Sequence, residues 1–226
     1  MKIRLDKLLS IRLGVSRTEA KKLICRGHVS VDEETIRLPK AQVDDGAVLK
    51  FYDEELFDMA SILVFHKPMG MVTTEDDPHE RNTVGDVLPR RYHIVGRLDM
   101  DTHGLLLFSK DGQLTQQLLH PKREVEREYI AKVEGFPTPE LIQQLADGIQ
   151  TSVGLAKGKV LSIDGDTVRL VVQEGRNRIV RRMLHNAGHS VLDLQRVRFG
   201  AFSLQDLPVG EYREATKTEL ASIVQS

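Results

Sequence analysis

A polar turn between two apolar stretches carries the residues of this sequence that are best suited to chemistry. The segment GRLDMDTHGLLLFSKDG, residues 96–112, contains the carboxylate of Asp99 two residues after Arg97. Functional side chains are often found on loops that a rigid scaffold positions, and an ionised carboxylate there can attack carbon or stabilise positive charge. Asp101 competes for this role, and an Asp-x-Asp-Thr turn also commonly caps a helix or ties a loop.

Four basic side chains recur at helical spacing near residue 180. They are Arg178, Arg181, Arg182 and His185. A helix over residues 176–188 would present them on one face and would turn Ile179, Met183 and Leu184 towards the core. One arginine of this face can keep a buried carboxylate charged while its neighbours bind phosphates. The alternative is a solvated basic face without a specific partner.

Two further candidates stand on predicted strands. Tyr129 lies in VEREYIAKVEG, residues 125–135, where it can be an ordinary core tyrosine or can present its ring to a ligand. Lys67 ends the strand ILVFHK, residues 62–67. It either shapes a pocket, touches a phosphate or simply ends the strand.

The histidines and the single cysteine lack the spacing of a metal site. The eight histidines form no His-Glu-x-x-His pair, and Cys25 alone can make neither an internal disulfide nor a cysteine-rich zinc site. We expect Cys25 to be a small buried residue. No glycine-rich phosphate loop with a following lysine is present, so neither a metal nor nucleotide hydrolysis is predicted.

Basic residues are concentrated at the amino-terminal end of the chain. Residues 1–30 contain eight basic and two acidic side chains, although the formal net charge of the whole chain is −1. Ser16 and Glu19 have capping-box spacing, which starts a helix at the next residue after Ser16, and Gly27 can end it. An earlier helix is expected over residues 3–13, and short strands follow. The side chains expected to contact the phosphates of a nucleic acid are Arg4, Arg17, Lys21, Lys22 and Arg26.

The pattern of elements predicts an α+β protein of two domains. An acidic linker, DEELFD at residues 53–58, closes a small amino-terminal module of helices and strands that covers residues 1–58. Residues 59–226 then contain strands in hairpins, with helices at residues 113–120, after Pro139 and from Thr216. This larger domain should have a mixed, mainly antiparallel sheet.

The turn at residues 96–112 resembles the hallmark of the RsuA family of pseudouridine synthases, a Gly-Arg-Leu-Asp sequence followed by a threonine and a Gly-Leu-Leu run. Further stretches resemble other family motifs in the same order, namely HKPMG at 66–70, REYIAKV at 127–133 and EGRNRIVRRM at 174–183. Residues 3 to about 52 resemble an S4 RNA-binding module. His103 is the main departure, because the family usually has a small residue there, and the histidine should affect positioning only.

The resemblance implies an enzyme with a pseudouridine synthase fold that isomerises a uridine of ribosomal RNA. It makes Asp99 the catalytic carboxylate, Tyr129 the ring that stacks on the target base, and Arg181 the basic partner of Asp99. Further candidates for contact with the substrate or the RNA are Arg97, Lys67, Arg178 and Arg182. The reaction moves uracil from N1 to C5 on the same sugar without redox change or hydrolysis, so no cofactor is needed.

The compact layout and the absence of a long basic tail favour 16S ribosomal RNA, the small-subunit RNA, as the substrate. The alternatives are 23S ribosomal RNA, the large-subunit RNA, and a role in ribosome biogenesis as a non-catalytic RNA-binding protein. The intact Asp99, Tyr129 and Arg181 argue against the non-catalytic role. The RNA partner could be naked or part of a partly assembled subunit.

The opening sequence MKIRLDKLLS has no apolar core of a signal peptide, and no stretch approaches the roughly twenty apolar residues that a membrane span needs. We therefore expect a cytoplasmic monomer without a membrane partner.

Overall fold

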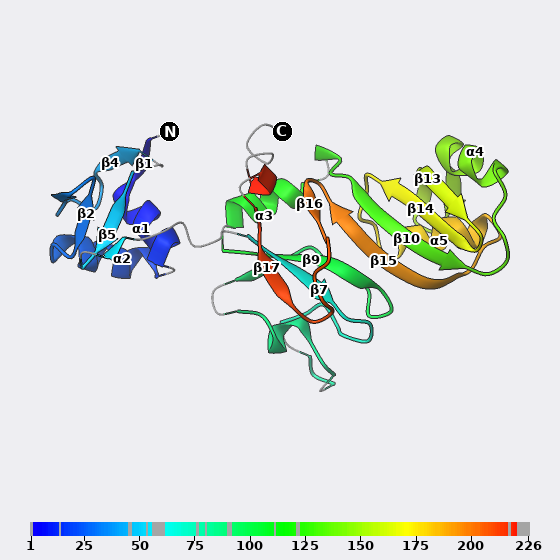
Figure 1. The fold of residues 1–226 in the computed structure, drawn as a ribbon, viewed down its shortest axis with the longest axis horizontal. Helices are drawn as coiled ribbons and strands as arrows, with labels where there is room; N and C mark the ends of the chain where they lie inside the picture. Colours follow the sequence, from blue (N-terminus) through cyan, green and yellow to red (C-terminus); the bar gives the residue numbers. More distant parts are fainter. Residues whose placement is uncertain are drawn as a thin grey trace. The chain divides into compact units, whose positions relative to one another are not determined.

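The computed structural model divides the chain into two units, Met1–Ser61 and Ile62–Ser226 (Figure 1). It describes residues 2–13, 15–44, 47–52, 54–55, 62–75, 77–79, 81–89, 92–110, 112–120, 123–216 and 218–220. The predicted boundary between residues 58 and 59 lies outside the described residues. The predicted acidic linker is partly strand, because Glu54–Glu55 forms β6, which pairs with the strand before it.

The first unit packs two helices against short strands. Its elements are β1 (Lys2–Arg4), α1 (Leu5–Leu13), α2 (Arg17–Cys25), β2 (Val29–Val31), β3 (Glu34–Thr35), β4 (Gln42–Asp44), β5 (Leu49–Phe51) and β6. The predicted first helix starts too early, because residues 2–4 pair with β4 as a strand. The start of α2 is confirmed, since Ser16 Oγ accepts a hydrogen bond from Glu19 N–H at 3.2 Å. Cys25 was wrongly expected to be buried, because it is exposed.

The second unit is built on a nine-stranded sheet. Its elements are β7 (Ile62–Lys67), the 3-10 helix η1 (Val84–Asp86), β8 (His93–Val95), β9 (His103–Ser109), α3 (Gly112–Leu119), β10 (Arg127–Val133), α4 (Glu140–Asp147), β11 (Ile149–Thr151), β12 (Gly154–Ala156), β13 (Lys159–Asp164), β14 (Thr167–Val172), α5 (Ile179–Asn186), β15 (Val191–Phe199), β16 (Phe202–Ser203) and β17 (Tyr212–Glu214). The sheet order is β13-β14-β10-β15-β9-β7-β17. In addition, β8 pairs with β9 and β16 pairs with β15. Among the pairings of described strands in this sheet, only that of β15 with β9 is parallel, so the predicted mixed, mainly antiparallel sheet is confirmed.

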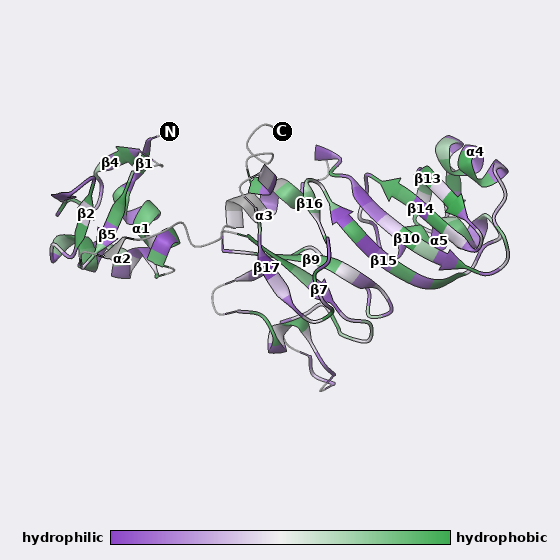
Figure 2. Ribbon diagram, in the orientation of Figure 1, coloured by the Kyte–Doolittle hydropathy of each residue, from purple (hydrophilic) through white to green (hydrophobic). Residues whose placement is uncertain are grey.

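Apolar side chains of the central strands form the core of the second unit. Figure 2 shows β7 and β9 as largely hydrophobic, and every residue of β7 is buried. Ile62, Leu105 and Phe199 belong to one buried cluster that joins β7, β9 and β15. The helix predicted from Thr216 is helical at residues 218–220. Among the described residues, no helix is long and apolar enough to cross a membrane.

The parallel pairing of β9 with β15 depends on a glycine. Gly104 lies opposite Arg196 and has a φ of +104°, and a Cβ added at this position would lie 2.3 Å from Arg196 O. Only glycine adopts such a backbone without strain while allowing this approach. The turn with Asp99 leads directly into β9, so this close approach also sets where the turn meets β15.

We predict that Gly104→Ala destabilises the second unit by at least about 2 kcal/mol, because the new Cβ would collide with backbone and would occupy a left-handed conformation. Hydrogen-exchange mass spectrometry should detect lower protection of β9 and β15. Gly112→Ala is the matched control, because nothing lies within 4 Å of an added Cβ there. Equal protection in both variants would contradict the prediction.

Candidate active site

A cavity of about 710 Å³ lies in the second unit beside the turn that carries Asp99. Strands β8, β10 and β15 and the segment before α5 contribute to its walls. The predicted site residues that line it are Arg97, Asp99, Tyr129 and Arg178. Lys67, Arg181 and Arg182 are not among its lining residues.

The loop after β7 holds the turn around Asp99. Thr73 Oγ1 donates a hydrogen bond to Leu98 O at 2.6 Å and accepts one from Leu98 N–H at 3.3 Å. Thr102 N–H donates to Asp99 O at 3.0 Å, which closes the turn on the other side. The side chain of Asp99 is 31% exposed and lines the cavity. The turn therefore presents this carboxylate on a fixed backbone.

Asp101, the other carboxylate of the turn, is engaged by two arginines. Arg178 donates hydrogen bonds to its two oxygens at 2.8 and 2.7 Å, and Arg181 Nε lies 3.3 Å from Asp101 Oδ2. The hydrogen bonds from Arg178 hold the pKa of the Asp101 carboxyl below its usual value. Arg178 Nη1 also lies 4.0 Å from Asp99 Oδ2. Asp101 thus holds a cation beside Asp99, which is the carboxylate that faces the cavity.

Among the described residues, Arg181 forms no ion pair with Asp99, and the pairing that the resemblance implies stays a prediction. Arg181 instead contacts Asp101 and donates a hydrogen bond to Val191 O at 3.0 Å. The predicted helix was also too long, because α5 begins at Ile179 and Arg178 is its N-cap in a left-handed conformation with φ +53°. This conformation places Arg178 outside the helix, although the helical spacing predicted it on the same face as Arg181 and Arg182.

The β10 strand brings Tyr129 to the cavity as predicted, with a side chain only 8% exposed. Sequence reasoning missed three residues that share this wall, namely Arg127, Arg196 and Phe199. Arg127 could have been found, because residues two apart on a strand share a face and it stands two residues before Tyr129. Arg196 could not, because an irregularity in β15 changes which of its side chains point to the cavity.

The family comparison agrees with this arrangement. Residues 61–186 match the family model described as RNA pseudouridylate synthase, and residues 3–49 match that of the S4 domain. The chain belongs to the RNA pseudouridylate synthase family. The sequence-based resemblance, the α+β fold class and the assignment as a pseudouridine synthase are confirmed.

Several curated relatives resemble this synthase over most of its length. Proteins named ribosomal large subunit pseudouridine synthase B from Vibrio cholerae and Pseudomonas aeruginosa are each 39% identical to it, over 95% and 96% of this chain. The protein of that name from Bacillus subtilis is 34% identical over 96% of this chain. This chain spans 72%, 60% and 93% of these three relatives, respectively. A solved pseudouridylate synthase is 29% identical, with a TM-score of 0.67, over 98% of this chain and 99% of that one.

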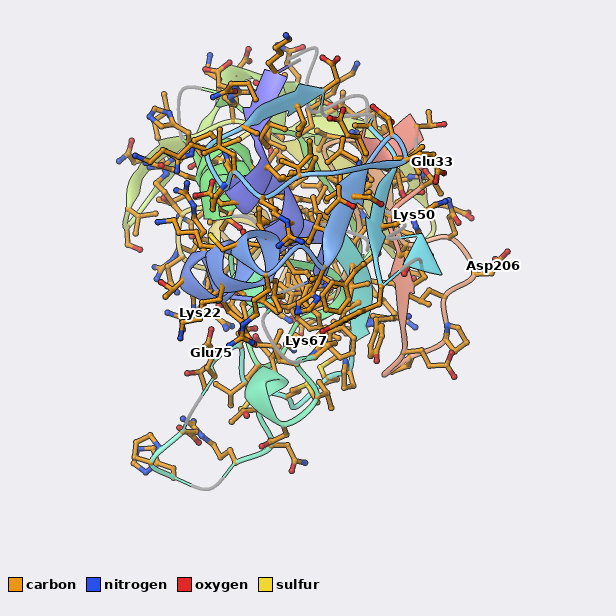
Figure 3. All side chains as sticks on the ribbon, turned by 90° about the vertical axis from the view of Figure 1, so that its left-hand side faces the viewer. Lys22, Glu33, Lys50, Lys67, Glu75 and Asp206 are labelled. Atoms are coloured by element: carbon orange, nitrogen blue, oxygen red, sulfur yellow. The ribbon has the colours of Figure 1, made fainter. Side chains whose placement is uncertain are left out.

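In the S4 unit, the predicted RNA-binding residues separate into two groups. Arg4 and Arg17 both pair with the buried carboxylate of Asp6, at 2.7 and 3.0 Å. The other three are exposed on or directly after α2, and they are Lys21, Lys22 and Arg26. Figure 3 shows Lys22 on the outer side of this helix. Figure 3 also labels Lys50 and Glu33, which form an ion pair at 2.5 Å on the strands of the same unit.

Lys67 and Arg182 contact protein rather than the cavity. Lys67 is 0% exposed, and its Nζ donates hydrogen bonds to Thr102 O at 2.8 Å and to Pro68 O at 2.9 Å. Arg182 Nε donates to Asn177 O at 3.0 Å. The amine of Lys67 therefore lies inside the protein and supports the turn of Asp99 through Thr102, which agrees with the strand-end alternative, and contact with substrate stays a prediction. Among the described residues, no group of three or more His, Cys, Asp or Glu could hold a metal ion.

Burial lowers the pKa of the Lys67 amine from 10.5 to about 8. Below this pKa the folded and unfolded chains both carry the proton, and the folded chain bears the cost of burying the charge. As the pH rises above about 8, the folded chain releases the proton before the unfolded chain does, so stability rises. A neutral amine still donates both hydrogen bonds.

We therefore predict that the stability of the wild-type chain relative to Lys67→Met increases by up to about 2 kcal/mol between about pH 7.5 and about pH 9.5. Urea unfolding followed by circular dichroism at both pH values measures this difference. The comparison cancels the titration of other groups. Parallel pH dependence of the two proteins would show that Lys67 keeps an ordinary pKa.

Proposed function

We propose that this synthase converts a uridine of large-subunit ribosomal RNA to pseudouridine, with Asp99 as the catalytic carboxylate. The observation that carries this proposal is the difference between the surroundings of the two carboxylates of the turn. Asp101 accepts two hydrogen bonds from Arg178, whereas Asp99 lines the cavity with Arg178 only 4.0 Å away. A cation this close to a carboxylate can stabilise the negative charge that the reaction needs.

The reaction breaks the bond between uracil N1 and sugar C1′ and joins the same two rings through C5. Asp99 either attacks the sugar or the base to form a covalent intermediate, or it stabilises the positively charged sugar while the base turns. The cavity confines the detached base, which favours rejoining over escape. Tyr129 supplies a stacking surface worth about 1 to 3 kcal/mol per base, which offsets the few kcal/mol of unstacking.

Arg178 takes the role that sequence reasoning gave to Arg181. Its left-handed N-cap position places the guanidinium near both carboxylates of the turn. Arg181 supports it indirectly by contacting Asp101 from the helix. A cation beside Asp99 offsets the desolvation that substrate binding would impose on the carboxylate.

For the RNA substrate we adopt the alternative from the sequence analysis, large-subunit ribosomal RNA, in place of the small-subunit RNA expected there. The relatives from Vibrio cholerae, Pseudomonas aeruginosa and Bacillus subtilis are all named as large-subunit synthases. Compact layout and tail length, which suggested the small subunit, say nothing about the residues that read RNA. The likeness to these relatives covers nearly the whole chain and therefore supports the large-subunit target better.

In cells that lack this protein, we predict that one pseudouridine disappears from large-subunit ribosomal RNA. Carbodiimide modification followed by reverse transcription maps every such site. The wild-type gene should restore the site and Asp99→Asn should not, because an amide is a poor nucleophile and carries no charge. Asp101→Asn, the matched control, should restore the site at least in part, because it loosens Arg178 without removing the carboxylate in the cavity.

Each outcome of this experiment separates the alternatives. A lost site in small-subunit RNA would keep the reaction and overturn the substrate. Restoration by Asp99→Asn but not by Asp101→Asn would exchange the roles of the two carboxylates. If no site is lost from either RNA, the chain would act on another RNA or only bind RNA.

The exposed basic residues of α2 should contact RNA phosphates. Replacing Lys21, Lys22 and Arg26 together by glutamine should weaken RNA binding. The slope of the logarithm of the binding constant against the logarithm of the salt concentration should become less steep by about 0.9 for each duplex phosphate that the variant no longer neutralises. Binding measured by fluorescence anisotropy at several salt concentrations tests this. Lys50→Gln is the control, because Lys50 already pairs with Glu33 on the strands. An unchanged slope in the triple variant would exclude α2 as an RNA-binding element.

A further inference from the structure

Two arginines line the cavity beside Tyr129 and have no part in the chemistry described so far. On β10, Tyr129 lies opposite Arg196 of β15, and Arg127 lies opposite Phe199. All four residues line the cavity. Directly opposite residues of an antiparallel pair are close neighbours, with Cβ atoms about 4.5 to 5.5 Å apart. The register thus gathers two cations and two aromatic rings on one wall.

An irregularity in β15 makes this wall possible. The partner of Glu128 is Arg198, but the partner of Tyr129 is Arg196, so Val197 is an extra residue on β15. In a regular strand, residues 196 and 199 would point to opposite faces, because they are an odd number of residues apart. The bulge turns both towards the cavity, as bulges beside active sites commonly re-aim a side chain.

Among the described residues, neither arginine forms an ion pair with a carboxylate. Arg196 is 3% exposed and donates from Nε to Leu105 O at 2.8 Å, while Arg127 donates from Nη1 to Val125 O at 2.9 Å. Their guanidinium carbons lie 5.1 and 4.9 Å from the centre of the Phe199 ring. Both charges are therefore held by backbone carbonyls and an aromatic ring.

The positive charge of Arg127 is partly offset by Glu174, which acts on it electrostatically without forming an ion pair. Glu174 also lines the cavity, but it accepts a hydrogen bond from Arg176 Nη2 at 2.8 Å. Burial lowers the pKa of Arg127 below its usual value. Buried cations are usually paired, and an unpaired one is costly. On the opposite face of β15, Arg198 shows the usual arrangement, with Glu128 at 2.8 Å and Glu126 at 2.9 Å.

We propose that Arg127 and Arg196 stabilise the negative charge that uracil acquires when its bond to the sugar breaks. The inference rests on the proposed pseudouridine synthase activity and deepens it. When the N1–C1′ bond breaks, its electron pair stays on uracil, and the negative charge spreads over N1 and the carbonyl oxygens of the base, while Asp99 stabilises or binds the sugar. The C5–C1′ bond then forms, a proton leaves C5 and one joins N1, so no co-reactant is consumed.

The position of the two cations favours the base over a backbone phosphate as their ligand. Arg196 is almost fully buried and stands next to Tyr129, the ring on which the base would stack. A phosphate is part of the RNA backbone, which stays outside the cavity, and it would have to reach the depth at which Arg196 lies. Cations fixed where charge develops, in a site that excludes water, are the arrangement that accelerates bond breaking.

Single-turnover kinetics with RNA tritiated at uridine C5 tests the proposal, since the reaction releases this tritium to water. With saturating enzyme, Arg127→Met should lower the rate constant by about 10²- to 10³-fold, the usual effect of losing one such donor. Arg127→Lys and Arg196→Lys keep the charge and should retain most of the rate. Circular dichroism checks that each variant folds. Arg198→Met, on the other face of β15, is the matched control and should turn over normally.

Measurements of RNA affinity and of its salt dependence distinguish uracil from a backbone phosphate as the ligand of the two arginines. The proposal requires that Arg127→Met changes neither appreciably. A normal rate constant with a flatter salt slope would identify a phosphate ligand and overturn the proposal, and so would a normal rate with a normal slope. If the wild-type protein itself releases no tritium, the proposed function fails, and not only the role of these arginines.

Discussion

The site depends on how closely three neighbouring strands can approach one another. Strand β15 pairs with β10 on one side and with β9 on the other, and Arg196 is the residue of β15 that faces Tyr129 on one strand and Gly104 on the next. A side chain at residue 104 would push β9 away, because an added Cβ would lie 2.3 Å from Arg196 O. Since Asp99 precedes β9 by one turn, the same glycine brings the carboxylate to the wall that carries Tyr129.

Charge pairing around Asp99 follows from this geometry. Asp101 forms ion pairs with Arg178, just before α5, and with Arg181, within α5. Asp101 therefore positions the two cations, while Asp99 lines the cavity. Lys67 adds support through its hydrogen bond to Thr102 O. The turn is therefore held by backbone, by an ion-pair cluster and by a buried amine. Such redundancy keeps a partly buried carboxylate in one place, which proximity effects require.

Much of the fold follows from local sequence rules. Ser16 begins a helix because its hydroxyl caps it, and the runs of apolar residues mark β7 and β9. The type of residue and its motif also identified Asp99 and Tyr129 as candidates. Helical spacing failed for Arg178, because this left-handed residue makes the helix begin later than the pattern assumed. The burial of the Lys67 amine and the place of Arg196 on the cavity wall could not be predicted for another reason, since burial of a strand end and a one-residue bulge are set by tertiary packing.

Counting charges would not have separated the arginines that pair with a carboxylate of the protein from those that do not. Arg4 and Arg17 are tied to the buried Asp6, and Arg198 is tied to Glu128, so each has a carboxylate to satisfy. In a chain with a formal net charge of −1, most basic residues can be neutralised in this way. The cations that we propose for contact with RNA are those on the outer face of α2 and those on the wall beside Tyr129. The first group suits long-range attraction of a polyanion, and the second suits a charge that exists only while a bond is breaking.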